Sequence, residues 1–212
     1  MQKVTVLSNY KVSTGVYVLE FKRPFPFRPG HVISIELQGM SRRIYSIASG
    51  NTEDRIKILY DVKKEGLVTP LLKEVKPGEW ITISEPFGNF YGEKGSAFWI
   101  ANGTGIAPFY SMLCSGMGES KTLIHGGRSL TTFYFQDDFS KQLNHNYIRC
   151  SSVEKLDGIY PGRLTSFLKE HNHLPPNQKY YLCGSPEMVV EVRDILISKH
   201  IPFGNIIAEI YF

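Results

Sequence analysis

The chain has two patterns of apolar and polar positions, and the change between them falls near residues 92–95. Before that point, short apolar runs rich in Val, Ile, Tyr and Phe are separated by turns that contain Gly and Pro, as is typical of β-strands. The runs cover residues 4–12, 15–21, 31–37, 42–49, 54–62 and 79–86. Their regular short spacing predicts an antiparallel β-barrel or sandwich, with one short helix at residues 68–73.

After that point, strand patterns alternate with helix patterns. Apolar runs suited to strands that are buried on both faces cover residues 96–101, 121–127, 146–153, 179–184 and 205–212. The clearest helix spans residues 185–200, where Ser185 is a good N-cap and Pro186 occupies the first helical position. This alternation predicts an α/β fold with a parallel sheet. We therefore expect two domains, at residues 1–93 and 95–212.

Length and charge refine this division. The 212 residues suit one large domain or two small ones, and a hydrophobic share of 42% excludes a chain that is disordered throughout. Residues 1–94 hold 14 Lys and Arg against 10 Asp and Glu, whereas residues 95–212 hold 10 of each, so the net charge of +4 lies in the first part. An anionic ligand or partner is therefore expected there, although the charge is too small to indicate nucleic acid.

Three cysteines, Cys114, Cys150 and Cys183, stand far apart in the sequence and form no C-x-x-C pair, so we expect no metal site. An odd number of cysteines without a signal peptide is typical of the reducing cytoplasm. The uncharged stretch at residues 95–118 has Gly103 and Pro108 near its centre. A membrane-spanning helix is therefore not expected there.

A Gly-x-Gly turn at Gly103 and Gly105 joins a strand to a helix that Pro108 opens. Glycines allow the backbone to approach a diphosphate closely, and a helix start offers free N–H groups, although a purely structural turn would look the same. About twenty residues later, where NAD sites place an acid, the chain has Arg128, which favours the 2′-phosphate of NADP over NAD. A solvated surface arginine is the alternative.

The first part contains two further candidate segments. Arg43, Tyr45 and Ser46 end a predicted strand, and Gly66 begins a segment that leads into the short helix. Arginine can clamp a phosphate in fork geometry, tyrosine can stack on a flat ring, and the amides of a helix start can hold a diphosphate. Tyr45 is also compatible with a simple role as a barrel residue.

Together these segments resemble the ferredoxin–NADP reductase family of flavoproteins, and the likeness covers nearly the whole chain. Five motifs stand in the order of that family. They are R-x-Y-S at residues 43–46, G-x-x-S/T at 66–69, the nucleotide turn at 103–108, C-G-x-P at 183–186, and an acidic–aromatic segment at 209–212. The resemblance implies an N-terminal six-stranded antiparallel β-barrel that binds FAD and a C-terminal α/β parallel-sheet domain that binds NAD(P)H. It points to the bacterial type, without an iron–sulfur domain.

The resemblance also implies the binding residues. Those for FAD would be Arg43, Ile44, Tyr45, Ser46, Tyr60, Gly66, Leu67, Val68, Thr69, Tyr211 and Phe212. Those for NAD(P) would be Gly103, Thr104, Gly105, Ile106, Arg128, Arg163, Cys183, Gly184 and Pro186.

Four residues would take part in the reaction. Ser46 would lie near flavin N5, Cys183 beside the reacting carbon of nicotinamide, and Tyr211 over the flavin face as a lid. Glu209 matches an acid that can relay protons, although a solvent-facing glutamate would look identical in sequence.

The activity implied is hydride transfer between NAD(P)H and FAD, with single electrons passing to or from ferredoxin or flavodoxin. The alternatives are a reductase for free flavin, ferric chelates or an oxygenase component, and an electron-transfer subunit of a larger complex. NADP-selective relatives often follow the third parallel strand with Ser-Arg, whereas this chain has Ser152-Val153. NADPH is therefore favoured only slightly over NADH.

Overall fold

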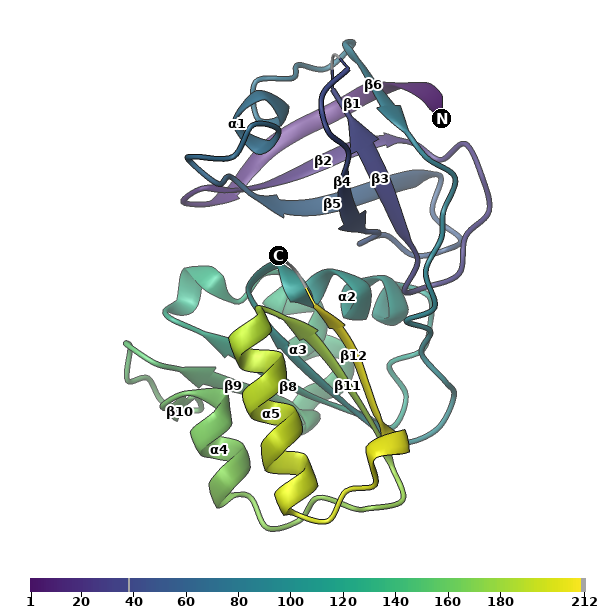
Figure 1. Cartoon of the computed structure of the whole chain (residues 1–212). Coiled ribbons are helices and arrows are strands. Elements are labelled where there is room, and N and C mark those ends of the chain that lie inside the picture. Colours follow the sequence, from purple (N-terminus) through teal and green to yellow (C-terminus); the bar gives the residue numbers. More distant parts are fainter. Residues whose placement is uncertain (38, 211–212) are drawn as a thin grey trace. The chain divides into compact units, whose positions relative to one another are not determined.

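The computed structural model describes residues 1–37 and 39–210, which form two compact units (Figure 1). The barrel unit comprises Met1–Tyr91 and Ala107–Ser115. The sheet unit comprises Gly92–Ile106 and the chain from Gly116 onward. The segment at residues 107–115 is thus grouped with the first part of the chain, although it lies within the second part of the sequence.

Six strands form the barrel unit in the order β4-β3-β6-β1-β2-β5, and each neighbouring pair is antiparallel. An antiparallel bridge between Ile47 and Ile58 connects the two end strands, which confirms the predicted barrel. Apolar side chains at alternate positions, such as Ile33 and Ile35, point inward and are fully buried. The strands are β1 (Gln2–Ser13), β2 (Val16–Lys22), β3 (Val32–Glu36), β4 (Arg43–Ser46), β5 (Arg55–Asp61) and β6 (Trp80–Ile83).

Two helices belong to the barrel unit, α1 (Thr69–Leu72) and α2 (Ala107–Cys114). Residues 107–113 of α2 are all buried, as expected of a helix that is mainly apolar all round. The Ser111 hydroxyl donates a hydrogen bond to the Ser49 carbonyl oxygen over 2.7 Å. Gly50 packs so closely on α2 that an added Cβ would lie 2.7 Å from the Cys114 carbonyl oxygen. These contacts attach α2 to the loop that follows β4.

The sheet unit contains a parallel sheet in the order β10-β9-β8-β7-β11-β12, which confirms the predicted α/β fold. Helices α4 and α5 pack together on one face of it (Figure 1). The strands are β7 (Ala97–Asn102), β8 (Lys121–Gly127), β9 (Tyr147–Ser151), β10 (Tyr160–Pro161), β11 (Lys179–Gly184) and β12 (Ile206–Ile210). The helices are α3 (Gln136–Leu143), α4 (Leu164–Glu170) and α5 (Pro186–Ser198), with 3-10 turns η1 (Gly103–Ile106), η2 (Leu130–Thr132), η3 (Asn144–Asn146) and η4 (Phe203–Asn205).

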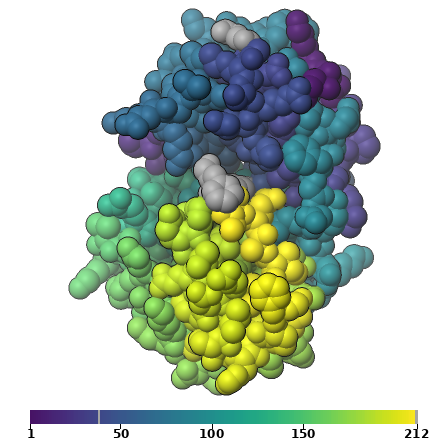
Figure 2. All heavy atoms as spheres, viewed as in Figure 1, coloured from purple at the N-terminus to yellow at the C-terminus, as the bar shows by residue number. Residues whose placement is uncertain are grey.

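Helix α5 confirms the clearest helix prediction. Ser185 is its N-cap, and the Ser185 side chain accepts a hydrogen bond from the backbone N–H of Met188. Its apolar face packs into the core, while its outer side forms part of the surface that Figure 2 shows in yellow, with Val190 and Ile197 exposed. Within the described part of the chain, no helix has the length and apolarity needed to cross a membrane.

Candidate functional site

Strand β4 carries the R-x-Y-S motif and exposes its first half. Arg43 and Ile44 are exposed, and Ile44 retains 61% of its accessible surface, whereas Ser46 is buried. Backbone pairing with β3 sets Ser46 opposite Val32. Because successive side chains of a strand alternate between its faces, Arg43 offers a cation on one face of β4 and Ile44 an apolar surface on the other.

Tyr45 holds a polar atom that the protein does not satisfy. Its hydroxyl oxygen is buried and has no hydrogen-bond partner among the described residues, and burial raises the pKa of this phenol to about 12. Its ring meets the ring of Tyr60 edge-on, with centroids 6.3 Å apart. A buried hydroxyl without a partner costs about 1–3 kcal/mol, so a ligand that hydrogen-bonds to Tyr45 would recover that free energy.

Tyr60 lies deeper than Tyr45, with only 1% of its surface exposed. Its hydroxyl donates to Asn9 Oδ1 over 2.9 Å, and Asn9 Nδ2 donates to the carbonyl oxygens of Leu72 (2.8 Å) and Val75 (3.0 Å). The structure therefore places Tyr60 in the barrel core, where it holds the end of α1 through Asn9. The hydroxyl of Tyr60 is already engaged, unlike that of Tyr45.

The G-x-x-T segment forms the start of α1. Leu67 is 70% exposed, whereas Val68 is buried. The Thr69 hydroxyl accepts a hydrogen bond from the backbone N–H of Lys63, which bends the segment back on itself. Within the described residues no side chain caps α1, but Pro70 has no N–H, and the N–H groups of Leu71 and Leu72 already donate to the Val68 carbonyl oxygen. A ligand would therefore meet the backbone of the segment just before the helix rather than its first turn.

These two segments fit FAD on the structure's own features. The unsatisfied Tyr45 hydroxyl needs a polar partner, and Ile44 and Leu67 offer apolar surface that a flat ring system can cover. Arg43 is an exposed cation suited to a diphosphate, and the backbone of the segment before α1 lies beside the exposed Leu67.

The nucleotide turn follows β7 and forms η1. Gly103 has φ of +55°, a conformation that favours glycine, and no described atom lies within 4 Å of the position a Cβ would take. Gly105 is the opposite case, because an added Cβ would lie 2.4 Å from the Cys183 carbonyl oxygen. Gly103 therefore leaves open space for a ligand, whereas Gly105 fastens the turn to the end of β11.

Cys183 and Glu209 lie side by side on neighbouring parallel strands. Cys183 is fully buried, Glu209 is half-buried, and the Cys183 Sγ donates to Glu209 Oε2 over 4.0 Å. The structure thus brings three predicted residues together at one end of the sheet: Gly105, Cys183 and Glu209.

Asn102 is a residue of this site that the sequence analysis missed. Its Oδ1 accepts the backbone N–H of Ser185 over 2.9 Å, and its Nδ2 donates to Ser185 Oγ over 3.4 Å. The available signal was a side chain able both to donate and to accept, placed directly before the glycine turn. Periodicity does not reveal its partner, which lies in another motif.

The remaining predicted residues are more scattered. Arg128 and Arg163 are both exposed, the first directly after β8 and the second at the N-cap position of α4. Ser46 belongs to the barrel unit, whereas Cys183 belongs to the sheet unit. The predictions for Tyr211 and Phe212 lie outside the described residues.

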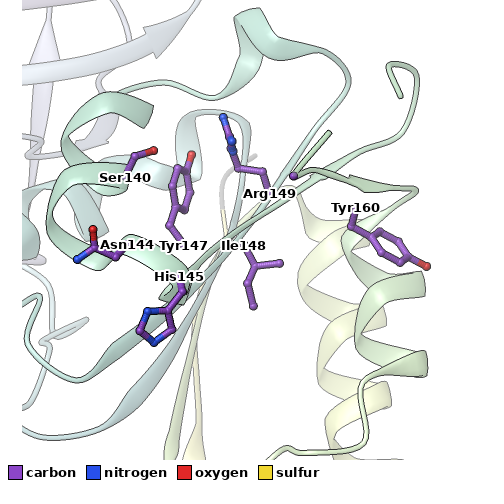
Figure 3. A pocket seen from close by; sticks show the side chains of 8 residues that line it. Ser140, Asn144, His145, Tyr147, Ile148, Arg149 and Tyr160 are labelled. Atoms are coloured by element: carbon purple, nitrogen blue, oxygen red, sulfur yellow. The ribbon is translucent and has the colours of Figure 1, made fainter. Parts of the chain in front are cut away.

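A pocket of about 600 Å³ lies beside β9, but it shares no residue with the predicted sites (Figure 3). The polar ends of His145, Arg149 and Tyr160 point in different directions and do not converge on one centre. Tyr147, one of the lining residues, has its hydroxyl 3.0 Å from His125 Nδ1. Burial, assisted by the charge of Arg149, lowers the pKa of His125 to about 3, so this imidazole is neutral at ordinary pH.

Two protein-family models match the chain. The Oxidoreductase FAD-binding domain matches residues 3–91, and the Oxidoreductase NAD-binding domain matches residues 99–194. Two curated relatives are each described as a probable dihydroorotate dehydrogenase B (NAD(+)), electron transfer subunit. That of Pyrococcus abyssi is 32% identical and that of Pyrococcus horikoshii 28%, and each alignment covers 92% of this chain and 74% of the relative.

Among solved structures, a ferredoxin NADP+ reductase from Neisseria gonorrhoeae with bound FAD and NADP has the same fold. It superposes with a TM-score of 0.87 at 21% identity, over 100% of this chain and 98% of that one. Both family models agree with the fold, which combines a barrel that carries the unsatisfied Tyr45 hydroxyl with a parallel sheet that carries the packed turn at Gly105. The chain belongs to the ferredoxin–NADP reductase family and is an NAD(P)H-dependent flavoenzyme that binds FAD.

Proposed function

We propose that this chain passes electrons between NAD(P)H and a separate ferredoxin or flavodoxin. When bound, the two cofactors supply the chemistry, since nicotinamide exchanges a hydride with FAD and flavin can exchange electrons singly. The observation that carries the proposal is the contact of Gly105 with the end of β11, because it holds Cys183 next to the turn that would bind the nucleotide.

On the barrel side, the proposed roles follow from exposure and charge. Arg43 and the backbone amides of residues 66–69 would hold the flavin diphosphate, and Ile44 and Leu67 would cover apolar parts of the cofactor. Tyr45 would place its hydroxyl against a polar atom of the flavin chain. Ser46 would lie near flavin N5, with Gly66 and Val68 shaping the turn around the diphosphate.

On the sheet side, the nucleotide turn would be lined by Gly103, Thr104 and Ile106. Gly184 and Pro186 would face it from the connection between β11 and α5. Cys183 would border the reacting carbon of nicotinamide and, being buried, would help exclude water. Its thiol donates to Glu209, so Glu209 can receive or return a proton at that sulfur.

We propose NADPH as the slightly favoured nucleotide. Arg128 and Arg163 are exposed cations in the sheet unit, available to a 2′-phosphate, whereas Val153 stands where an additional arginine would be expected. An anaerobic titration of the purified protein with NADPH and with NADH tests this. Bleaching of the flavin absorbance by NADH at far lower concentration than by NADPH would contradict it.

The chain end has a separate role in this proposal. Tyr211 would cover the flavin face that nicotinamide must reach, and Phe212 would extend that cover. Both assignments rest on the family's motif alone.

The proposed electron acceptor follows from the distribution of charge along the chain. The excess of Lys and Arg in residues 1–94 favours an acidic carrier in the cytoplasm. Steady-state assays with ferredoxin, flavodoxin, free FMN and ferric citrate test this choice. A protein carrier should be reduced fastest, and its rate should fall with ionic strength. Faster turnover with FMN or ferric citrate would instead favour a flavin or ferric reductase.

A second candidate, an electron-transfer subunit, is supported by the two Pyrococcus relatives, which carry that description over 92% of this chain. In that case the chain should co-purify with a catalytic partner from its source and show little independent turnover. High diaphorase activity of the isolated chain would count against it.

A further inference from the structure

The two nucleotide loops of the sheet unit are tied together by one side chain. Asn102 is the last residue of β7, directly before the turn that starts at Gly103. Ser185 begins the loop that leads from β11 into α5. Asn102 accepts the Ser185 N–H over 2.9 Å, while the Ser185 hydroxyl caps α5 at Met188. The carboxamide thus links the end of one strand to the start of the helix after another.

Two glycines make room for this link. A Cβ on Gly184 would lie 1.9 Å from Asn102 Oδ1, so any larger residue at 184 would displace the carboxamide. A Cβ on Gly105 would lie 2.4 Å from the Cys183 carbonyl oxygen. The two loops therefore contact each other through main chain at Gly105 and through a side chain at Asn102. Cys183 is the first attachment point, and Ser185, two residues later, is the second.

We propose that Asn102 is a positioning residue for hydride transfer. By holding Ser185 and Gly184, it fixes Cys183 and the adjoining backbone at the nicotinamide end of the bound nucleotide. The inference rests on the proposed function of this site. Because reactive geometry must hold to within about 1 Å, loosening the loop lowers the rate of hydride transfer more than it lowers nucleotide affinity.

The first test replaces Asn102 by alanine and by aspartate. Asn102→Ala removes the acceptor of the Ser185 N–H, so we expect the limiting rate of flavin reduction by NAD(P)H, measured by stopped flow, to fall about tenfold. Asn102→Asp keeps an acceptor but adds negative charge near the nucleotide. It should leave the limiting rate within about twofold of the parent while raising the KM for NAD(P)H.

Asn205→Ala is the matched control, because the Asn205 carboxamide is likewise bonded to the backbone of a distant residue, its Nδ2 donating to the Pro176 carbonyl oxygen at an exposed position. It should change neither the limiting rate nor KM. A limiting rate for Asn102→Ala equal to that of the control would overturn the proposal. So would an equally slow Asn102→Asp, since that variant retains the hydrogen bond to Ser185.

A double-mutant cycle tests the geometry directly. Gly184→Ala in the parent pushes its Cβ against the carboxamide and should slow hydride transfer. In the Asn102→Ala background that obstacle is gone, and the nearest remaining neighbour is the flexible end of Met188. The backbone strain of alanine at φ of +150° is common to both backgrounds. The effect of Gly184→Ala should therefore be clearly smaller in the second background, and additive effects would count against the link.

A readout independent of activity separates this inference from the proposed function. Hydrogen exchange of the Ser185 amide, followed by NMR, should be faster in Asn102→Ala than in the parent and unchanged in Asn205→Ala. If neither nucleotide reduces the parent flavin, the proposed function fails, and unchanged Ser185 exchange would reject the link itself. Normal reduction of the parent with no difference in the variants would reject only the positioning role.

Discussion

The two predicted cofactor sites are built from different parts of the polypeptide. On the barrel side, the candidate contacts are mostly exposed side chains, with Leu67 at 70% and Ile44 at 61% exposure. On the sheet side they are mostly main chain, with Gly105 packed against β11 and Gly184 against Asn102. The barrel site keeps an unsatisfied hydroxyl at Tyr45, whereas in the sheet site the Asn102 carboxamide is hydrogen-bonded.

This difference indicates that ligands act differently on the two sites. FAD would complete the barrel site by covering apolar side chains and pairing a buried hydroxyl, so its binding should stabilise the protein strongly. The nucleotide would enter a site whose backbone is already fixed. Mutations should therefore act mainly on affinity in the first site and mainly on rate in the second.

The largest expected effect is that of Gly105→Ala. Its Cβ would collide with the Cys183 carbonyl, so the turn must move, and we expect flavin reduction by NAD(P)H to fall about a hundredfold. FAD content should be unchanged. Gly204→Ala is the control, because no described atom lies within 4 Å of its Cβ position. Loss of FAD from Gly105→Ala would show that the nucleotide site and the FAD site are not independent.

Next is Arg43→Ala, which removes a cation from the barrel site. Hydrogen bonds to charged groups contribute about 1.5–3 kcal/mol, so the Kd for FAD should rise about tenfold or more. Equilibrium titration of the apoprotein measures it. The reduction rate of the FAD-loaded fraction should stay near that of the parent. Arg193→Ala, at a half-buried arginine paired with Asp194, should leave FAD affinity unchanged.

A smaller effect is expected on folding stability when the pH is lowered. The pKa of His125 is lowered to about 3 in the folded protein by burial and by Arg149, against 6.5 normally. The unfolded chain therefore binds this proton first as pH falls, and folding stability contributed by the neutral imidazole is lost from about pH 6.5 downward. At pH 5.5 the loss is about 1.4 kcal/mol. Urea unfolding at neutral pH and at pH 5.5 should show this loss of folding stability, and the loss should be smaller in His125→Gln.

The smallest effect concerns the proposed lid. Tyr211→Ser should tighten nicotinamide binding and lower turnover, because serine does not compete with nicotinamide for the flavin face. Fluorescence titration with the oxidised nucleotide, followed by steady-state kinetics, measures both. If affinity and turnover both stay at the parent values, Tyr211 has no part in the mechanism.

Most of the fold was predictable because burial leaves a clear pattern. The six barrel strands, five of the parallel strands and α5 all follow period-2 or helical spacing or continuous apolar runs. Strand β10 has only two residues, Tyr160 and Pro161, and such a length leaves no pattern. The grouping of α2 with the barrel was also out of reach, because it depends on long-range contacts such as Ser111 with Ser49.

The candidate site was predictable only as separate motifs. Local residue chemistry pointed to Gly105 and the family resemblance to Cys183, but neither indicated the contact between them, which the parallel pairing of β7 with β11 creates. Tyr60 is a weaker predicted contact for FAD, and the sequence holds no sign that Asn9 engages its hydroxyl. Asn102 was missed because its role depends on Ser185, a residue of a distant motif.

The placement of α2 has a consequence for protein engineering. A recombination point at residues 92–95 would exchange the nucleotide-binding part as one block, but it would also remove the helix that covers Ser49 and Gly50. A chimaera made at that point would inherit a foreign α2 on a native barrel. Transplanting cosubstrate preference from a relative therefore requires the native residues 107–115 to be kept inside the grafted block.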